Sequence, residues 1–168
     1  GFHLHHDHDR TRRTLSLSYP GYIASLLLLR RLRPLGVKPA STPAIYTPPH
    51  FGSSAPQLPT TDSSPPASLT QKKVLQVAIG YLLYYGRCVD GRVLPATCAL
   101  ASAQTQATLA TMAALDRLLG FVSAHPDGRK VFHPSDMQLA VLSNASYLSR
   151  PHAGSVAGSF HHFSSPRP

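Results

Sequence analysis

Residues 139–147 read LAVLSNASY and residues 156–163 read VAGSFHHF, with a polar segment between them. Short runs rich in β-branched and aromatic residues on either side of a turn are typical of paired strands. We therefore expect two short strands near the end of the chain, with Asn144 inside the first. Residues 130–133 (KVFH) predict another short strand just before them. Because a lone hairpin is marginally stable in water, further partner strands are expected beyond Pro168.

Three helices are expected between residues 68 and 124. Ser68 or Thr70 is placed to cap the first, which runs to about Val89. The second runs from about residue 94 to 103, and the third from about 107 to 124, where the breaker sequence HPDG follows. Apolar residues recur near one face of the first and third helices, which predicts a helical core. They are Val74, Leu75, Ala78, Ile79, Leu82 and Tyr85 in the first, and Leu109, Met112, Leu119 and Val122 in the third.

The start of the chain predicts a β-hairpin. Phe2 and Leu4 alternate with histidines, residues 14–17 alternate again, and residues 9–12 (DRTR) lie between them as the turn. Alternation of this kind is the pattern of a half-buried strand.

A helix and a linker are expected to follow this hairpin. The helix runs from Gly21 to about Leu32, with Pro20 at its first position and Ser18 or Tyr19 near its cap. Residues 37–68 are rich in Pro, Ser, Thr and Ala, a composition that buries little surface. They predict a linker or an extended arm that wraps a neighbouring part of the protein.

The charge of the chain favours a polyanionic partner. Its 168 residues include sixteen Lys and Arg against seven Asp and no Glu, which gives a formal net charge of +9. Such a balance is typical of proteins that bind a polyanion such as nucleic acid or an anionic membrane, although a basic surface without a dedicated partner is the alternative. The lack of Glu leaves few candidates for a two-metal carboxylate site.

Neither a secretory signal nor a membrane-spanning run is expected. The longest apolar run, Ile23 to Leu29, falls far short of the roughly 20 residues that cross a bilayer, and the N-terminus is polar and rich in His. An intracellular chain, in the cytoplasm or nucleus and without a membrane partner, is therefore expected.

Six basic side chains are candidates for contact with nucleic acid, because Lys and Arg bind phosphates. Three of them, Arg30, Arg31 and Arg33, lie at or just beyond the end of the helix expected from Gly21 to about Leu32. For these three the alternative is ordinary charge at a helix C-terminus. The six are Arg30, Arg31, Arg33, Lys72, Lys73 and Arg87. Three tyrosines are candidates for stacking on bases, although core packing is expected for at least two of them. These are Tyr81, Tyr84 and Tyr85.

No metal site or disulfide is expected. Cys88 and Cys98 are too few for a disulfide framework and lack the paired spacing of a zinc site, so they are expected to be buried small apolar residues. Histidine is a common metal ligand, but a site needs fixed geometry, so adventitious binding is favoured for the N-terminal histidines. These are His3, His5, His6 and His8.

Several runs, taken in order, resemble the polyproteins of LTR retrotransposons of the copia type or a related lineage. Residues 1–8 (GFHLHHDH) and 18–23 (SYPGYI) resemble the last palm hairpin of reverse transcriptase and the run after it. Four further runs resemble the connection helices and the approach to RNase H. They are GYLLYYGRCVD at 80–90, LASAQ at 100–104, HPD at 125–127 and HPSDM at 133–137. Residues 143–147 (SNASY) and 157–160 (AGSF) resemble the first RNase H strand and its partner.

The resemblance implies an α+β fold in four parts. Residues 1–36 would end the palm and begin a thumb-like segment, and residues 37–68 would be the linker. Residues 69–128 would be the helical connection, and residues 129–168 an incomplete start of RNase H.

The resemblance also implies a parent that is an RNA-directed DNA polymerase and an RNA–DNA hybrid ribonuclease using Mg²⁺. Its partners would be the hybrid, or another nucleic acid, and the rest of the polyprotein. Asn144 stands where the family has its first RNase H Asp, and an amide lacks the negative charge that Mg²⁺ prefers. Asp136 is expected in a turn or cap. We therefore expect this chain by itself to be inactive and to hold no cofactor.

Two other interpretations remain open. One is a non-enzymatic basic module that binds nucleic acid or a partner. The other is a helical interaction protein with disordered arms, whose likeness to the retrotransposon family arose by chance.

Overall fold

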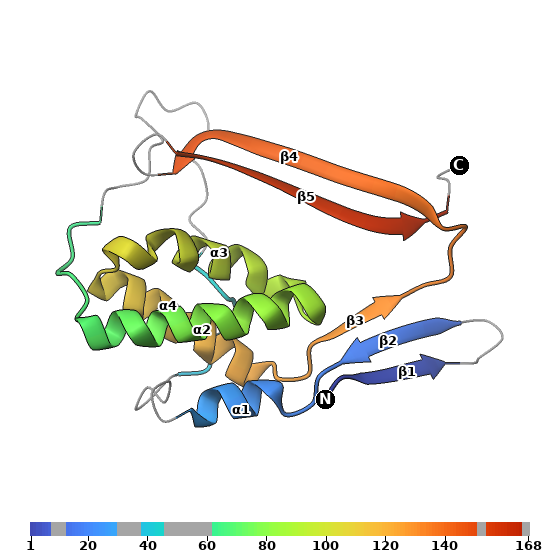
Figure 1. Ribbon diagram of the computed structural model, residues 1–168, viewed down its shortest axis with the longest axis horizontal. Coiled ribbons are helices and arrows are strands. Elements are labelled where there is room, and N and C mark those ends of the chain that lie inside the picture. The colour runs from blue at the N-terminus through green and yellow to red at the C-terminus, as the bar shows by residue number, and fades with distance from the viewer. Residues whose placement is uncertain (8–12, 30–37, 46–61, 151–153, 166–168) are drawn as a thin grey trace.

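The computed structural model describes residues 1–7, 13–29, 38–45, 62–150 and 154–165. Four helices and two small antiparallel sheets make a mixed α+β fold, which confirms the predicted class (Figure 1). The helices are α1 (Tyr22–Leu28), α2 (Leu69–Cys88), α3 (Leu94–Ala103) and α4 (Leu109–Ala124). The strands are β1 (His3–Asp7), β2 (Thr14–Ser18), β3 (Arg129–Phe132), β4 (Gln138–Arg150) and β5 (Gly154–Ser164).

The N-terminal sheet combines two strands that precede the helices, β1 and β2, with one that follows them, β3. β1 and β2 form the predicted hairpin, whose expected turn at residues 9–12 lies outside the described residues. β3 begins one residue earlier than expected and pairs with β2, giving the order β1-β2-β3 (Figure 1). The register sets Leu17 between Leu4 and Lys130, so side chains on these three strands share one face.

The start of α1 differs from the expectation. Gly21 is its N-cap, so Pro20 precedes the helix and neither Ser18 nor Tyr19 caps it. Gly21 has φ of 76°, a left-handed conformation that glycine adopts without steric cost, and the helix begins only after it. α1 ends at Leu28, earlier than the predicted Leu32, and residues 30–37 lie outside the described residues.

The three connection helices match their predicted bounds closely. Ser68, rather than Thr70, caps α2 through a capping box with Gln71. Thr108 and Thr111 make the same reciprocal arrangement at α4. Because Thr108 is extended, α4 begins two residues later than expected.

The core lies among these helices and α1. Its largest fully buried side chains include Leu26, Leu75, Leu82, Leu118 and Leu119. Leu109 was expected on the core face, but it lies at the first residue of α4 and is exposed. Cys98 is also exposed and Cys88 only half-buried, so the expectation of two buried cysteines was wrong. Small size permits burial of a cysteine, but the side of the helix on which it lies decides the outcome.

The end of the expected linker is attached to α4. The Ala67 amide donates to the Ala107 carbonyl at 2.9 Å, and the Leu109 amide donates to Pro65 at the same distance. Asp62 accepts a short hydrogen bond from the hydroxyl of the Thr108 cap. Ala67 is buried, although the composition of this segment predicted little burial. The described residues 62–67 thus run as an arm against the helices.

β4 and β5 form a long antiparallel hairpin, not the two short strands expected. Their register sets Asn144 opposite Gly158, and it shifts between Ser146 and Arg150. In Figure 1 this ribbon starts beyond β3 and runs along the top of the view, above α3 and on the opposite side of the helices from β1 and β2. Asp136 lies in the segment before β4, where its amide donates to the Ser165 hydroxyl at 3.2 Å.

No helix in the described part of the chain is both long enough and apolar enough to cross a membrane.

Candidate nucleic-acid interface

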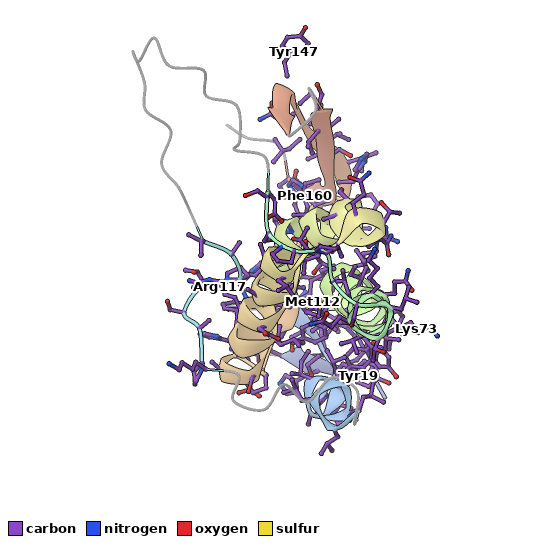
Figure 2. The ribbon with its side chains drawn as sticks, turned by 90° about the vertical axis from the view of Figure 1, so that its left-hand side faces the viewer. Tyr19, Lys73, Met112, Arg117, Tyr147 and Phe160 are labelled. Atoms are coloured by element: carbon purple, nitrogen blue, oxygen red, sulfur yellow. The ribbon has the colours of Figure 1, made fainter. Side chains whose placement is uncertain are left out.

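Three of the six predicted basic residues lie on α2. Lys73 and Arg87 are exposed, and Figure 2 shows the Lys73 side chain on the outer side of the helix bundle. Lys72 is half-buried and its ammonium donates to the Thr105 carbonyl at 3.2 Å, so it links α2 to the segment after α3. The other three predicted residues, Arg30, Arg31 and Arg33, lie outside the described residues.

The exposed side of α2 brings together Lys73, Tyr84 and Arg87, which we call the basic face of α2. With Val77 and Gly80 between them, these positions are three or four residues apart, so they lie along one side of the helix. The opposite side packs into the core through residues such as Leu75, Leu82 and Tyr85. α2 contains no acidic residue, so no negative side chain of the helix offsets its cations.

The three candidate tyrosines have different surroundings. Tyr85 is 1% exposed and belongs to the core, Tyr81 is half-buried, and Tyr84 is 46% exposed. Core packing was expected for at least two of them, and the structure shows it for Tyr85 and, in part, for Tyr81. Tyr84 therefore remains the tyrosine of α2 with a ring available to a base.

An aromatic cluster lies behind the basic face of α2. Tyr22 of α1 is at its centre, with ring centroids 5.7 to 5.8 Å from those of Tyr81, Tyr84 and Tyr85. The Tyr22 hydroxyl donates to the Tyr81 carbonyl at 3.3 Å. Burial, followed by the neighbouring Tyr81 and Tyr84 phenols, raises the pKa of Tyr22 to about 12. The hydroxyl therefore stays neutral and remains a hydrogen-bond donor near neutral pH.

Phe2 joins this cluster from the residues before β1. Its ring centroid is 4.7 Å from that of Tyr19 and 6.0 Å from that of Tyr84. The sequence contained no signal for the second contact, because Phe2 and Tyr84 belong to different elements far apart in the chain. The contact depends on how the sheet packs against α2.

Lys130 adds a further positive charge at the end of α2. Its ammonium donates to the Arg87 carbonyl at 2.8 Å, which satisfies a carbonyl in the last turn of the helix. An ammonium has three donors, so further donors remain for a phosphate. Lys130 was predicted only as part of a strand, and the pairing of β3 with β2 brings it here.

A packed junction positions β3, and with it Lys130. The Asp90 carboxylate is buried and accepts two hydrogen bonds from the Arg92 guanidinium, at 2.8 and 2.7 Å. The Arg92 guanidinium lies 5.5 Å from the centre of the Phe121 ring, which stacks on His125. A methyl group at Gly128 would come within 2.8 Å of the Asp90 Cβ. The HPDG sequence was expected to end a helix, and its Gly128 also packs against Asp90 here.

Asn144 lies in a different part of the molecule, on the β4–β5 hairpin. Its side-chain oxygen accepts a hydrogen bond from the Ala145 amide at 2.8 Å. The described residues that line the adjacent surface hollow include no other carboxylate, amide or imidazole side chain. They are Ser143, Asn144, Ala145, Ala157, Gly158 and Ser159. The hollow therefore provides no set of charged oxygens of the kind Mg²⁺ prefers.

No three His, Cys or Asp side chains of the described residues lie close enough together to hold a metal ion. His3, His5 and His6 on β1 are among these residues, whereas His8 lies outside them.

Comparisons with known proteins found no match to the chain among protein-family models, curated proteins or solved structures. The resemblance to retrotransposon polyproteins thus stays a prediction from sequence motifs, and the basic face of α2 is the surface from which a function can be argued.

Proposed function

We propose that this chain is a catalytically inactive segment of a retroelement reverse transcriptase and RNase H polyprotein that binds nucleic acid. The parent would act on RNA–DNA hybrids with Mg²⁺, in the cytoplasm or nucleus, together with the rest of the polyprotein. The observation that carries the binding proposal is the basic face of α2. There Lys73, Tyr84 and Arg87 lie along the exposed side of a helix that contains no acidic residue.

Electrostatics supports a polyanionic ligand at this surface. Each phosphate that a Lys or Arg neutralises releases condensed counterions, so affinity falls as salt concentration rises. Lys130 extends the positive charge beyond Arg87 at the end of the helix. The nearby Asp90 is paired bidentately with Arg92, which reduces the repulsion that its charge would exert on phosphate.

The proposed inactivity is supported by Asn144 and its neighbours. RNase H chemistry places two metal ions among several carboxylates, which activate the attacking water and stabilise the leaving oxygen. The hollow beside Asn144 is lined by serine, alanine and glycine. Binding by the basic face of α2 does not depend on this hollow, because the two surfaces belong to different elements.

The test is equilibrium binding of the whole chain to a fluorescein-labelled RNA–DNA hybrid with Mg²⁺ present, followed by anisotropy over a salt titration. A Lys73→Gln/Arg87→Gln variant should weaken binding at low salt. The salt slope should fall by about 0.9 for each duplex phosphate that the variant no longer neutralises, or by about 2 in total. The same samples, examined on a gel, should show no cleavage.

An Arg13→Gln/Lys38→Gln variant is the matched control. It removes two exposed charges that lie outside α2, so the net charge changes equally. If both double variants reduce affinity to the same extent, binding follows overall charge and the basic face of α2 is not the site. A chain that shows no salt-dependent binding would contradict the binding proposal, and cleavage of the hybrid would contradict the proposed inactivity.

A further inference from the structure

We infer that Phe2 and Tyr84 form a stacking platform for an unpaired base, so that the basic face of α2 prefers single-stranded nucleic acid to a duplex. This inference rests on the proposed binding of nucleic acid and names the form of the ligand for the same surface.

The two rings are close together and open to solvent. Phe2 is 42% exposed and Tyr84 is 46% exposed, and both are large aromatic side chains. Their centroids are 6.0 Å apart, with the ring planes inclined at 43°. Each ring thus keeps part of its surface free for a flat ligand, while the other ring lies near enough to contact the same base.

Other aromatic rings hold this platform in place. Tyr19 lies 4.7 Å from Phe2, and Tyr22 lies 5.8 Å from Tyr84, measured between ring centroids. Tyr22 is itself held by the hydrogen bond from its hydroxyl to the Tyr81 carbonyl. Side chains that are already ordered lose little conformational entropy when a ligand binds, so the support raises the affinity for a stacked base.

Positive charges flank the platform along α2. Arg87 follows Tyr84 by three residues and lies on the same side of the helix, and the Lys130 ammonium is bonded to the Arg87 carbonyl. Lys73 lies fourteen residues before Arg87, about 21 Å away at the rise of an α-helix. Cations that follow a backbone, combined with rings on which bases stack, are the features by which proteins bind single strands.

A duplex cannot use the platform in the same way. In a duplex each base is paired and covered on both faces by its neighbours, so only sugars and phosphates would reach Phe2 and Tyr84. An unpaired base has an accessible face and stacks without the cost of opening a helix. The cations would hold either ligand, whereas the rings would add affinity for the single strand alone.

The experiment compares two probes with the whole chain at one salt concentration. The probes are a fluorescein-labelled twelve-nucleotide oligo(dT) and the same strand annealed to oligo(rA). The wild-type chain should bind the single strand more tightly than the hybrid. Tyr84→Leu and Phe2→Leu, which keep apolar bulk but remove the flat ring, should each weaken single-strand binding about tenfold and hybrid binding less than about twofold.

Two further variants separate stacking from a change in fold. Tyr84→Phe keeps the ring and should retain single-strand affinity. Tyr147→Leu removes another exposed tyrosine, on the β4–β5 hairpin, and should change neither affinity. Far-UV circular dichroism of each variant checks that the helices are intact.

The outcomes distinguish this inference from the proposed function. If the hybrid binds as tightly as the single strand, or if both leucine variants bind oligo(dT) like wild type, the platform is wrong while nucleic-acid binding stands. If the wild-type chain binds neither probe, both proposals are wrong.

Discussion

The helical core and the β4–β5 hairpin both carry regular patterns of apolar residues, but they differ in what covers them. In the core, residues such as Leu75, Leu82 and Leu118 are fully buried by neighbouring helices. In the hairpin, Leu142 and Phe160 remain more than half exposed. Figure 1 shows the same contrast, with the helices packed together and the hairpin lying apart from them along the top of the view. A pattern identifies a surface that is able to be buried, whereas burial itself depends on a neighbour.

This difference determines where stability resides. Apolar surface contributes roughly 25 cal/mol for each Å² that is removed from water, so the helices gain this term and the exposed hairpin side chains gain little of it. The hairpin depends mainly on its ladder of backbone hydrogen bonds and on cross-strand contacts. Substitutions of the same type in the two regions should therefore have unequal effects on the free energy of unfolding.

The largest contrast is expected from truncation of one leucine in each region. Leu82→Ala should destabilise the protein by about 2–5 kcal/mol, because it leaves a cavity at a fully buried position. Leu142→Ala should change the free energy of unfolding by about 0.5 kcal/mol or less. Urea unfolding followed by circular dichroism at 222 nm measures both. Equal destabilisation by the two variants would show that the hairpin is covered in solution.

A smaller contrast is expected when each region gains one methyl group. Gly128→Ala should cost about 1–3 kcal/mol, because the new Cβ would approach the Asp90 side chain and the Tyr85 hydroxyl too closely. Gly158→Ala is the matched control on β5, where no described atom lies within 4 Å of the added carbon. It should be neutral or slightly stabilising, because glycine weakens a strand. The same urea titration measures both variants. An unchanged free energy of unfolding for Gly128→Ala would show that the Asp90 and Tyr85 side chains move aside at little cost.

A pH-dependent effect is expected at Tyr22, where α1 packs against α2. The folded-state pKa of Tyr22, about 12, exceeds the ordinary value of 10.0, so the folded state retains this proton after the unfolded state has lost it. The stabilisation that results from this difference in the pKa of Tyr22 is fully present below pH 10, and it is lost as pH rises from 10 to 12. Tyr22→Phe should reduce the loss of stability across this range. Identical pH profiles for wild type and Tyr22→Phe would contradict the raised pKa.

The smallest effect is expected from restoring a carboxylate to the hairpin. Asn144→Asp should confer neither Mg²⁺-dependent cleavage of an RNA–DNA hybrid nor a shift of the thermal midpoint with Mg²⁺, because the described residues lining the hollow offer no second carboxylate. Gel analysis and a thermal melt with and without Mg²⁺ test this. Cleavage by the variant would mean that a catalytic site is assembled around residue 144.

Much of the fold was predictable because its signals are local. Ser68 with Gln71 forms a capping box within a few residues, and α3 occupies the predicted range of residues 94–103. The start of α1 was missed because Gly21 adopts a left-handed conformation that postpones the helix. The long β4–β5 hairpin was expected as two short strands, since the apolar run in the sequence covers only part of each strand.

The candidate interface was predictable only in part. Lys73 and Arg87 were candidates because of their charge, and both are exposed on α2. The sequence predicted that at least two of the three candidate tyrosines pack in the core, but it could not separate the exposed Tyr84 from the buried Tyr85. That distinction depends on where α1 and the N-terminal sheet pack against α2.

The sequence by itself determined the α+β class, the bounds of α2 and α3, and the strongly basic charge, because caps, breakers and periodicity act over a few residues. The tertiary structure alone decided that β3 pairs with β2, that Lys130 reaches the end of α2, and that Phe2 lies beside Tyr84. These contacts join parts of the chain that are distant in sequence. They form because the packing of the whole core, and not any local preference, sets which surfaces meet.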